Sequence, residues 1–126
     1  MSLEDRRVVE NVRSMVVPKA QVAMGEKKGS PLTLEIDWES FASSNTSLEK
    51  LEGEAFRDLT RVFGLISRDE MGKEALKTIT KVVVHMATVP KEVKLVVANG
   101  TIDYYLIPGR QVVMESDMKK LIETAI

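Results

Sequence analysis

The clearest hydrophobic pattern in the chain is a pair of apolar segments, residues 93–98 and 101–107, separated by Asn99-Gly100. This arrangement predicts a β-hairpin, because both central residues of a type I′ turn need a positive φ and Asn-Gly adopts it readily. Side chains alternate along each strand, so the turn places the apolar residues of both strands on one face. That face is predicted to carry Val93, Leu95, Val97, Ile102, Tyr104 and Leu106.

Two earlier segments also have the pattern of strands. Residues 32–38 alternate between apolar and polar side chains, and residues 81–87 are rich in β-branched side chains. The stretch 88–92 is short enough for a hairpin loop, which would join the second of these strands to the Asn-Gly hairpin. Residues 111–114 are a candidate for a short edge strand.

Apolar residues recur at steps of three and four in the intervening segments, which predicts helices over residues 3–24, from 48 to 66, from 71 to 79 and from 118 to 125. Pro18 removes one backbone N–H and is expected to kink the first helix near Ser14. Hydroxyl-containing N-terminal capping patterns begin at Thr46 and Ser67, and Ser116 is expected to cap the last helix.

The resulting order of elements, α-β-α-α-β-β-β-α, is typical of an α+β domain. We expect one domain spanning residues 1–126, with an antiparallel sheet of about four strands packed against about four helices. The sheet would consist of a β-meander formed by the last three strands, with the strand at 32–38 added beside the one at 81–87.

Composition narrows the functional classes. The 126 residues carry a net charge of −1 and include no cysteine, which excludes disulfides and thiolate chemistry. Basic residues form no stripe that would indicate a nucleic-acid binder, and no apolar run approaches the length of a membrane helix. The N-terminal segment is charged where a signal peptide would be apolar, so a cytoplasmic protein without nucleic-acid or membrane partners is expected.

Residues that could carry chemistry are few. His85 is the only histidine, and it lies in a predicted strand without a neighbouring Asp, Glu or Ser. The sequence has no metal-ligand spacing, no phosphate-binding loop and no dinucleotide fingerprint. It therefore predicts no catalytic residue, no metal and no cofactor.

A polar loop at the end of the first predicted strand contains the only tryptophan of the chain. Carboxylates and hydroxyls gathered at a strand end are typical of many binding loops. The simpler interpretation is that the aromatic side chain anchors the core while the polar residues make turn hydrogen bonds. The loop residues are Asp37, Trp38, Glu39 and Ser40.

The second face of the predicted sheet is unusually apolar for a surface left in water. Either the N-terminal helix covers it, or another copy of the chain or a partner protein does. Tyrosine is enriched at protein interfaces, so Tyr105 would be an anchor in the second case. The candidate interaction surface consists of His85, Val96, Asp103 and Tyr105.

These observations favour a small soluble, non-enzymatic domain for protein interaction or regulation, acting on a partner protein or by self-association as a homodimer. The alternative is a ligand-binding protein or enzyme that uses carboxylates and the single histidine in a cleft at the sheet edge. Its residues would be Asp37, Glu39, His85 and Tyr105. A concave pocket that brings these side chains together would favour the alternative.

Overall fold

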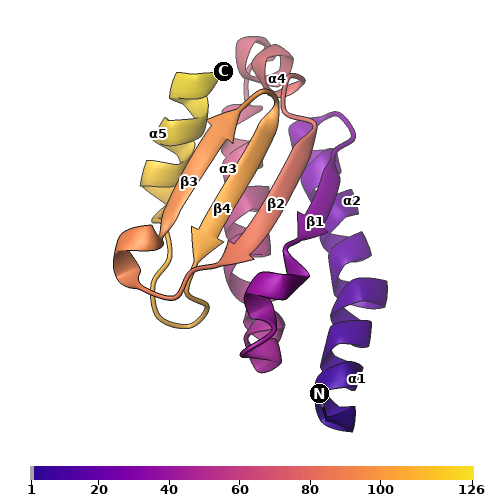
Figure 1. Cartoon of the computed structure of the whole chain (residues 1–126). Coiled ribbons are helices and arrows are strands. Elements are labelled where there is room, and N and C mark those ends of the chain that lie inside the picture. Colours follow the sequence, from indigo (N-terminus) through magenta and orange to yellow (C-terminus); the bar gives the residue numbers. More distant parts are fainter. Residues whose placement is uncertain (1) are drawn as a thin grey trace.

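The protein folds as an α+β structure in which helices cover one face of a four-stranded sheet and the other face stays open (Figure 1). The structure is a computed structural model that describes residues 2–126. The strands are β1 (Thr33–Ile36), β2 (Lys81–Met86), β3 (Lys94–Ala98) and β4 (Thr101–Leu106), arranged in the order β1-β2-β4-β3.

The helical segments form about four rods, as the sequence predicts. The N-terminal rod consists of α1 (Leu3–Asn11), a π-helical turn (Val12–Val16) and α2 (Val17–Lys28). The others are α3 (Arg57–Ile66), α4 (Glu70–Leu76) and α5 (Glu115–Ala125). Shorter turns are 3₁₀ segments at Trp38–Phe41, Asn45–Lys50 and Pro90–Glu92, and a π-helical segment at Glu52–Phe56.

The predicted hairpin is confirmed in its turn and its register. Asn99 and Gly100 have φ values of 53° and 76°, as a type I′ turn requires. The pairs run from Ala98↔Thr101 to Lys94↔Tyr105. Within this hairpin the side chains of Leu95, Ile102, Tyr104 and Leu106 are buried against the helices.

The predicted antiparallel meander is wrong, because the sheet is mixed. β4 lies between β2 and β3 and runs parallel to β2, so the segment after β2 crosses to the outer edge of the sheet. The physical reason lies in the two hairpin strands. β4 contributes three fully buried side chains (Ile102, Tyr104 and Leu106), which suits a central strand, whereas β3 is polar or exposed at alternate positions and suits an edge.

β1 lies beside β2, as expected, but the two strands are parallel. A parallel pair needs a long crossover connection, and residues 37–80, which contain α3 and α4, provide it. The strand β1 is shorter than the predicted strand 32–38, because Trp38 already belongs to a 3₁₀ turn.

The N-terminal rod absorbs Pro18 through a change of helix type. The π-helical turn lies directly ahead of α2, and the Ser14 hydroxyl donates to the Glu10 carbonyl at 2.7 Å. The irregularity therefore falls where the proline predicts it. The rod continues beyond the predicted end at residue 24 and stops at Gly29, whose φ of 83° is left-handed.

The capping predictions fail at three helices. The segment from Thr46 forms a 3₁₀ turn without a side-chain cap. α4 is capped by Asp69, whose carboxylate accepts from the Gly72 N–H at 2.7 Å, rather than by Ser67. α5 begins at Glu115 without a side-chain cap, and the predicted edge strand at 111–114 is reduced to a single bridge between Ile107 and Gln111.

The core lies between the sheet and α3, whose side chains Leu59, Val62 and Phe63 are fully buried. α2 packs along α3 and beside β1, and α5 packs against α3 and β3 (Figure 1). The N-terminal rod therefore does not cross the second face of the sheet. Within residues 2–126 that face, which we call the open face, has no helix over it.

Candidate functional site

One row of side chains crosses the open face from edge to edge. In the sheet register His85 of β2 lies opposite Tyr105 of β4, and Tyr105 lies opposite Lys94 of β3. Asp37 extends this row beyond β1, because its N–H donates to the Val84 carbonyl at 2.9 Å and continues the parallel ladder. Four chain segments thus place Asp37, His85, Tyr105 and Lys94 side by side.

His85 is held between two carboxylates. Its Nδ1 lies 2.9 Å from Oδ2 of Asp37, and its Nε2 lies 2.8 Å from Oδ1 of Asp103. An ionised carboxylate can only accept hydrogen bonds, so both contacts are hydrogen bonds when each ring nitrogen carries a proton. In that state the imidazolium neutralises one of the two negative charges.

The histidine ring also stacks on Tyr105. The ring centroids are 4.2 Å apart and the planes differ by 9°. Lys94 Nζ lies 5.1 Å from the centroid of the tyrosine ring, a distance at which a cation is attracted by the π face. The His85 side chain is only 15 % exposed, although no helix of residues 2–126 covers this face. The side chains of this row therefore hold one another in place.

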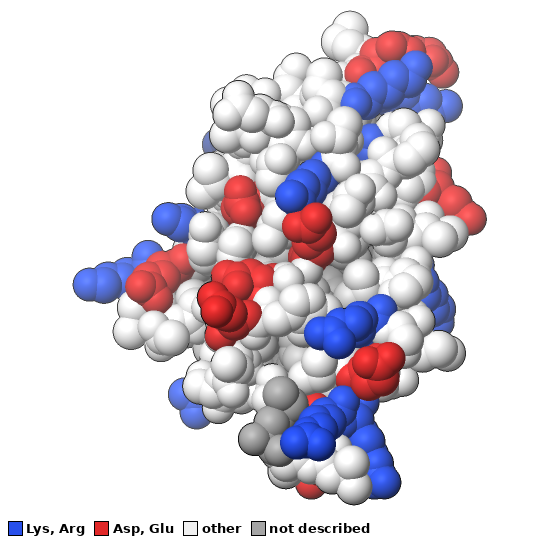
Figure 2. Space-filling view, turned by 45° about the vertical axis from the view of Figure 1, so that its right-hand side comes forward, with Lys and Arg blue, Asp and Glu red and all other residues white. Residues whose placement is uncertain are grey.

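The row bordering this cluster is less polar. Val83 of β2 and Val96 of β3 flank Asp103, and Val96 is 41 % exposed. Glu35 of β1 reaches Lys81, with 3.1 Å between carboxylate oxygen and ammonium nitrogen. The open face thus presents valine and tyrosine surface between charges of both signs. Figure 2 shows basic and acidic side chains interspersed on the side of the molecule nearer β1.

The polar loop does not act as one unit. Asp37 joins the histidine cluster, whereas Glu39 is exposed. The Ser40 hydroxyl donates to the Asp37 carbonyl at 2.7 Å and accepts from the Met86 N–H at 2.9 Å, which fixes the turn. Trp38 packs against the core and lies under the Arg13 guanidinium, 4.9 Å from the ring centroid. Of the four loop residues, only Asp37 reaches the other candidates.

Of the predicted interaction surface, all four members lie on the open face, and His85 contacts both Asp103 and Tyr105. Lys94 completes the row; the alternation of side chains predicts it on this face, but it is not among the four candidate residues. The hairpin register does place Lys94 opposite Tyr105, so that signal was available. The contact between His85 and Asp103 could not be anticipated, because it depends on β4 lying directly beside β2.

The cluster lies on a surface and not in a hollow. Five hollows formed by the described residues have no lining from Asp37, His85, Asp103 or Tyr105, and one of about 780 Å³ lies between β3, α5 and the segment before α5. Within residues 2–126, no group of three or more His, Asp or Glu side chains could hold a metal ion. The carboxylates of Asp37 and Asp103 each face a ring nitrogen of His85, which lies between them.

Burial shifts the pKa of three groups in the core and the helical layer. Burial raises the pKa of Tyr104 to about 12, and its hydroxyl accepts from the Val113 N–H at 3.0 Å. Burial, with help from Glu115, raises the pKa of Asp58, and burial lowers the pKa of Lys28. Lys28 donates to the Leu76 carbonyl at the end of α4 at 3.1 Å. Each shift is explained by a structural position inside the helical layer.

Comparisons of the chain with protein-family models, with curated proteins and with solved structures find no match. Among the helices of the described residues, none is both long and apolar enough to cross a membrane. What the structure defines is an α+β fold with a mixed sheet, one face of which is covered by helices while the other carries an ordered polar and aromatic cluster.

Proposed function

We propose that this chain is a protein-interaction domain and that the open face is its binding surface. The observation that carries the proposal is the cluster of Asp37, His85, Asp103 and Tyr105, which is fixed by internal contacts while it stays accessible to a partner. A side chain that is already ordered loses little conformational entropy when a partner binds. A fixed cluster of this kind suits recognition.

The composition of the open face supports the same proposal. Tyrosine is enriched in interface cores, and apolar surface ringed by charges is typical of transient protein contacts. Tyr105 lies at the centre of the row, with exposed Val96 on the neighbouring row. Charges of both signs around them would set the orientation of the partner more than its affinity.

A catalytic role for His85 is less well supported. Each ring nitrogen faces a carboxylate oxygen, at 2.9 and 2.8 Å, so a substrate would have to displace one of these carboxylates to reach the ring nitrogen. The cluster also lacks a surrounding hollow that could exclude water from a bound small molecule. These two observations favour a protein partner over the enzyme alternative.

The partner could be a second copy of the chain, since a flat sheet face can pair with itself around a two-fold axis. A cytoplasmic setting is part of the same proposal, because a chain without cysteine gains nothing from an oxidising compartment. Light scattering at increasing protein concentration separates self-association from binding to a different protein.

The test compares the proteins retained from cells that make this chain by the wild type and by Tyr105→Glu. The glutamate adds a charge at the centre of the face, so we expect the specific partner, or the second copy, to be lost. Met15→Glu is the matched control, because Met15 is 65 % exposed on the N-terminal rod, away from the sheet. Equal retention by all three proteins would remove the open face from consideration.

A further inference from the structure

The two edges of the sheet differ in how their backbone groups are satisfied. At the β1 edge, the Leu34 N–H donates to Oε1 of Gln21 at 2.8 Å, so a side chain of α2 occupies that edge. At the β3 edge, no side chain of the described residues hydrogen-bonds to the backbone of Leu95 or Val97. β3 is therefore the edge open to another strand.

The direction of these free groups follows from the hairpin. In a two-residue hairpin the pair flanking the turn, Ala98↔Thr101, exchanges hydrogen bonds, and bonded and non-bonded pairs then alternate along the ladder. Leu95 and Val97 belong to non-bonded pairs. Their N–H and C=O groups point away from β4, toward the outer side of β3, which leaves two donors and two acceptors in line along the edge.

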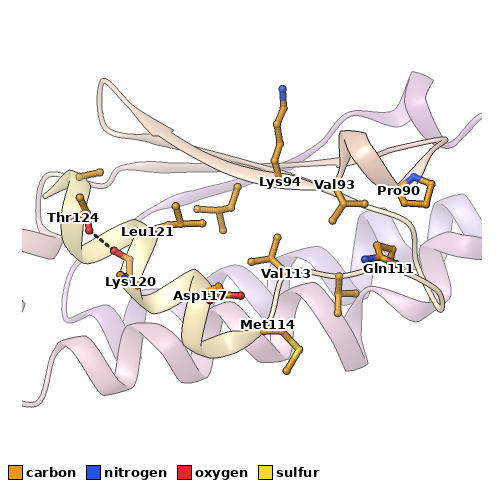
Figure 3. Close-up of a pocket in the computed structure, with 13 residues that line it drawn as sticks. Pro90, Val93, Lys94, Gln111, Val113, Met114, Asp117, Lys120, Leu121 and Thr124 are labelled. Atoms are coloured by element: carbon orange, nitrogen blue, oxygen red, sulfur yellow. Dashed lines mark hydrogen bonds between the residues drawn. The ribbon is translucent and has the colours of Figure 1, made fainter.

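The hollow between β3 and α5 lies beneath this edge (Figure 3). Its volume is about 780 Å³, and its walls come from the start of β3, from α5 and from residues 111–114. Its apolar lining includes Leu121, which is 44 % exposed, and Met114, which is 65 % exposed. Lys94 belongs to the same strand but points away from the hollow, toward the open face (Figure 3).

We propose that the groove between β3 and α5 binds an extended polypeptide segment that adds a strand to the sheet at β3. The backbone of such a segment would pair with Leu95 and Val97, while every second side chain, which must be apolar, would enter the hollow. Backbone pairing supplies affinity and the hollow supplies selectivity in this mode of recognition. A small apolar molecule could fill the hollow but would leave the edge groups without partners.

β3 is short and carries one charged side chain, Lys94, but it lacks two other devices that often protect a sheet edge. It contains no proline, and the ladder with β4 is continuous over all five residues, without a bulge. Natural proteins commonly block exposed edges by such devices or by covering them. The groove is separate from the open face, so this proposal stands or falls independently of the function proposed above.

The experiment selects random dodecapeptides displayed on phage against the wild-type chain, with Leu121→Lys for counter-selection. Leu121→Lys places a charge in the hollow at an exposed position, and Met15→Lys is the matched control outside the groove. Circular dichroism and thermal melting check that both variants keep the fold. A selected peptide is then synthesised in two forms. One form has normal amides; in the other, every second amide, on the edge of the peptide that pairs with β3, is N-methylated.

We expect enriched peptides to carry apolar residues at alternate positions and to lose affinity by about tenfold or more with Leu121→Lys, but not with Met15→Lys. N-methylation should abolish binding, and the amide signals of Leu95 and Val97 should shift when the normal peptide binds. Absence of enrichment over Leu121→Lys would overturn the proposal. Undiminished binding of the N-methylated peptide would also overturn it, because the groove would then be an apolar small-molecule site. Self-association that Leu121→Lys abolishes would overturn it too, because the edge would then bind a second copy.

Discussion

At the residue scale, His85 is the side chain on which the open face depends. It links Asp37, which follows β1, to Asp103 of β4, and it supports the ring of Tyr105. The sequence around His85 gives no hint of these partners, because each comes from a distant segment. Only the parallel pairings of β2 with β1 and with β4 bring the carboxylates to its two nitrogens.

Replacing this histidine should cost more stability than an ordinary exposed ion pair. His85→Ala removes the contacts of the ring with two carboxylates and one ring stack, and we expect the free energy of unfolding to fall by about 1 to 2 kcal/mol. Lys81→Ala is the control, since Lys81 forms one exposed pair with Glu35 on the same face and should cost at most about 0.5 kcal/mol. Urea denaturation measures both; equal losses would mean that the cluster is not held together as described.

Tyr104 gives a pH-dependent prediction. Burial raises its pKa from 10.0 to about 12, so the folded chain holds the hydroxyl proton more tightly than the unfolded chain does. The resulting stabilisation is complete below pH 10 and is lost as the pH rises toward 12. Denaturation midpoints measured over this range should fall for the wild type and fall less for Tyr104→Phe. Parallel curves for the two proteins would contradict the assignment to Tyr104.

At the scale of elements, local sequence signals predicted the hairpin, whereas the order of the strands depends on contacts between distant segments. The hairpin could be predicted with its register, because Asn99-Gly100 and the alternation of apolar residues determine it within fifteen residues of chain. The strand order could not, since the choice between β3 and β4 as the neighbour of β2 is made by burial in the assembled core. Capping patterns were misleading for a related reason: the hydroxyl-rich segment at Thr46 forms a 3₁₀ turn without a side-chain cap in place of a helix start.

The hairpin turn provides a test at this scale. A Cβ at Gly100 would lie 2.7 Å from the Thr78 carbonyl oxygen, and its φ of 76° is unfavourable for other residues. Gly100→Ala should therefore lower the free energy of unfolding by more than about 1 kcal/mol. A Cβ at Gly53 would meet nothing within 4 Å, so Gly53→Ala is the matched control and should be neutral or stabilising. Thermal melts distinguish the two, and an unaffected Gly100→Ala protein would argue against the tight turn.

At the scale of the whole molecule, helices on one side leave a sheet with one open face and one open edge. The candidate residues on that face could be identified from the alternation of side chains alone, once the strands were recognised. Their contacts, and the fact that the N-terminal rod lies beside the sheet and not across it, required the packing of α2 against α3. The functional proposal rests on this exposed, internally ordered surface.

The most direct measurement of that proposal places a photo-reactive p-benzoylphenylalanine at Val96, which is exposed on the open face where β3 lies beside Asp103 of β4. The same residue at Met15, on the N-terminal rod, is the control. Irradiation in living cells should give a defined covalent adduct, with a partner protein or with a second copy, from position 96 and not from position 15. Adducts that are absent from position 96, or equally abundant at both positions, would contradict a binding role for the open face.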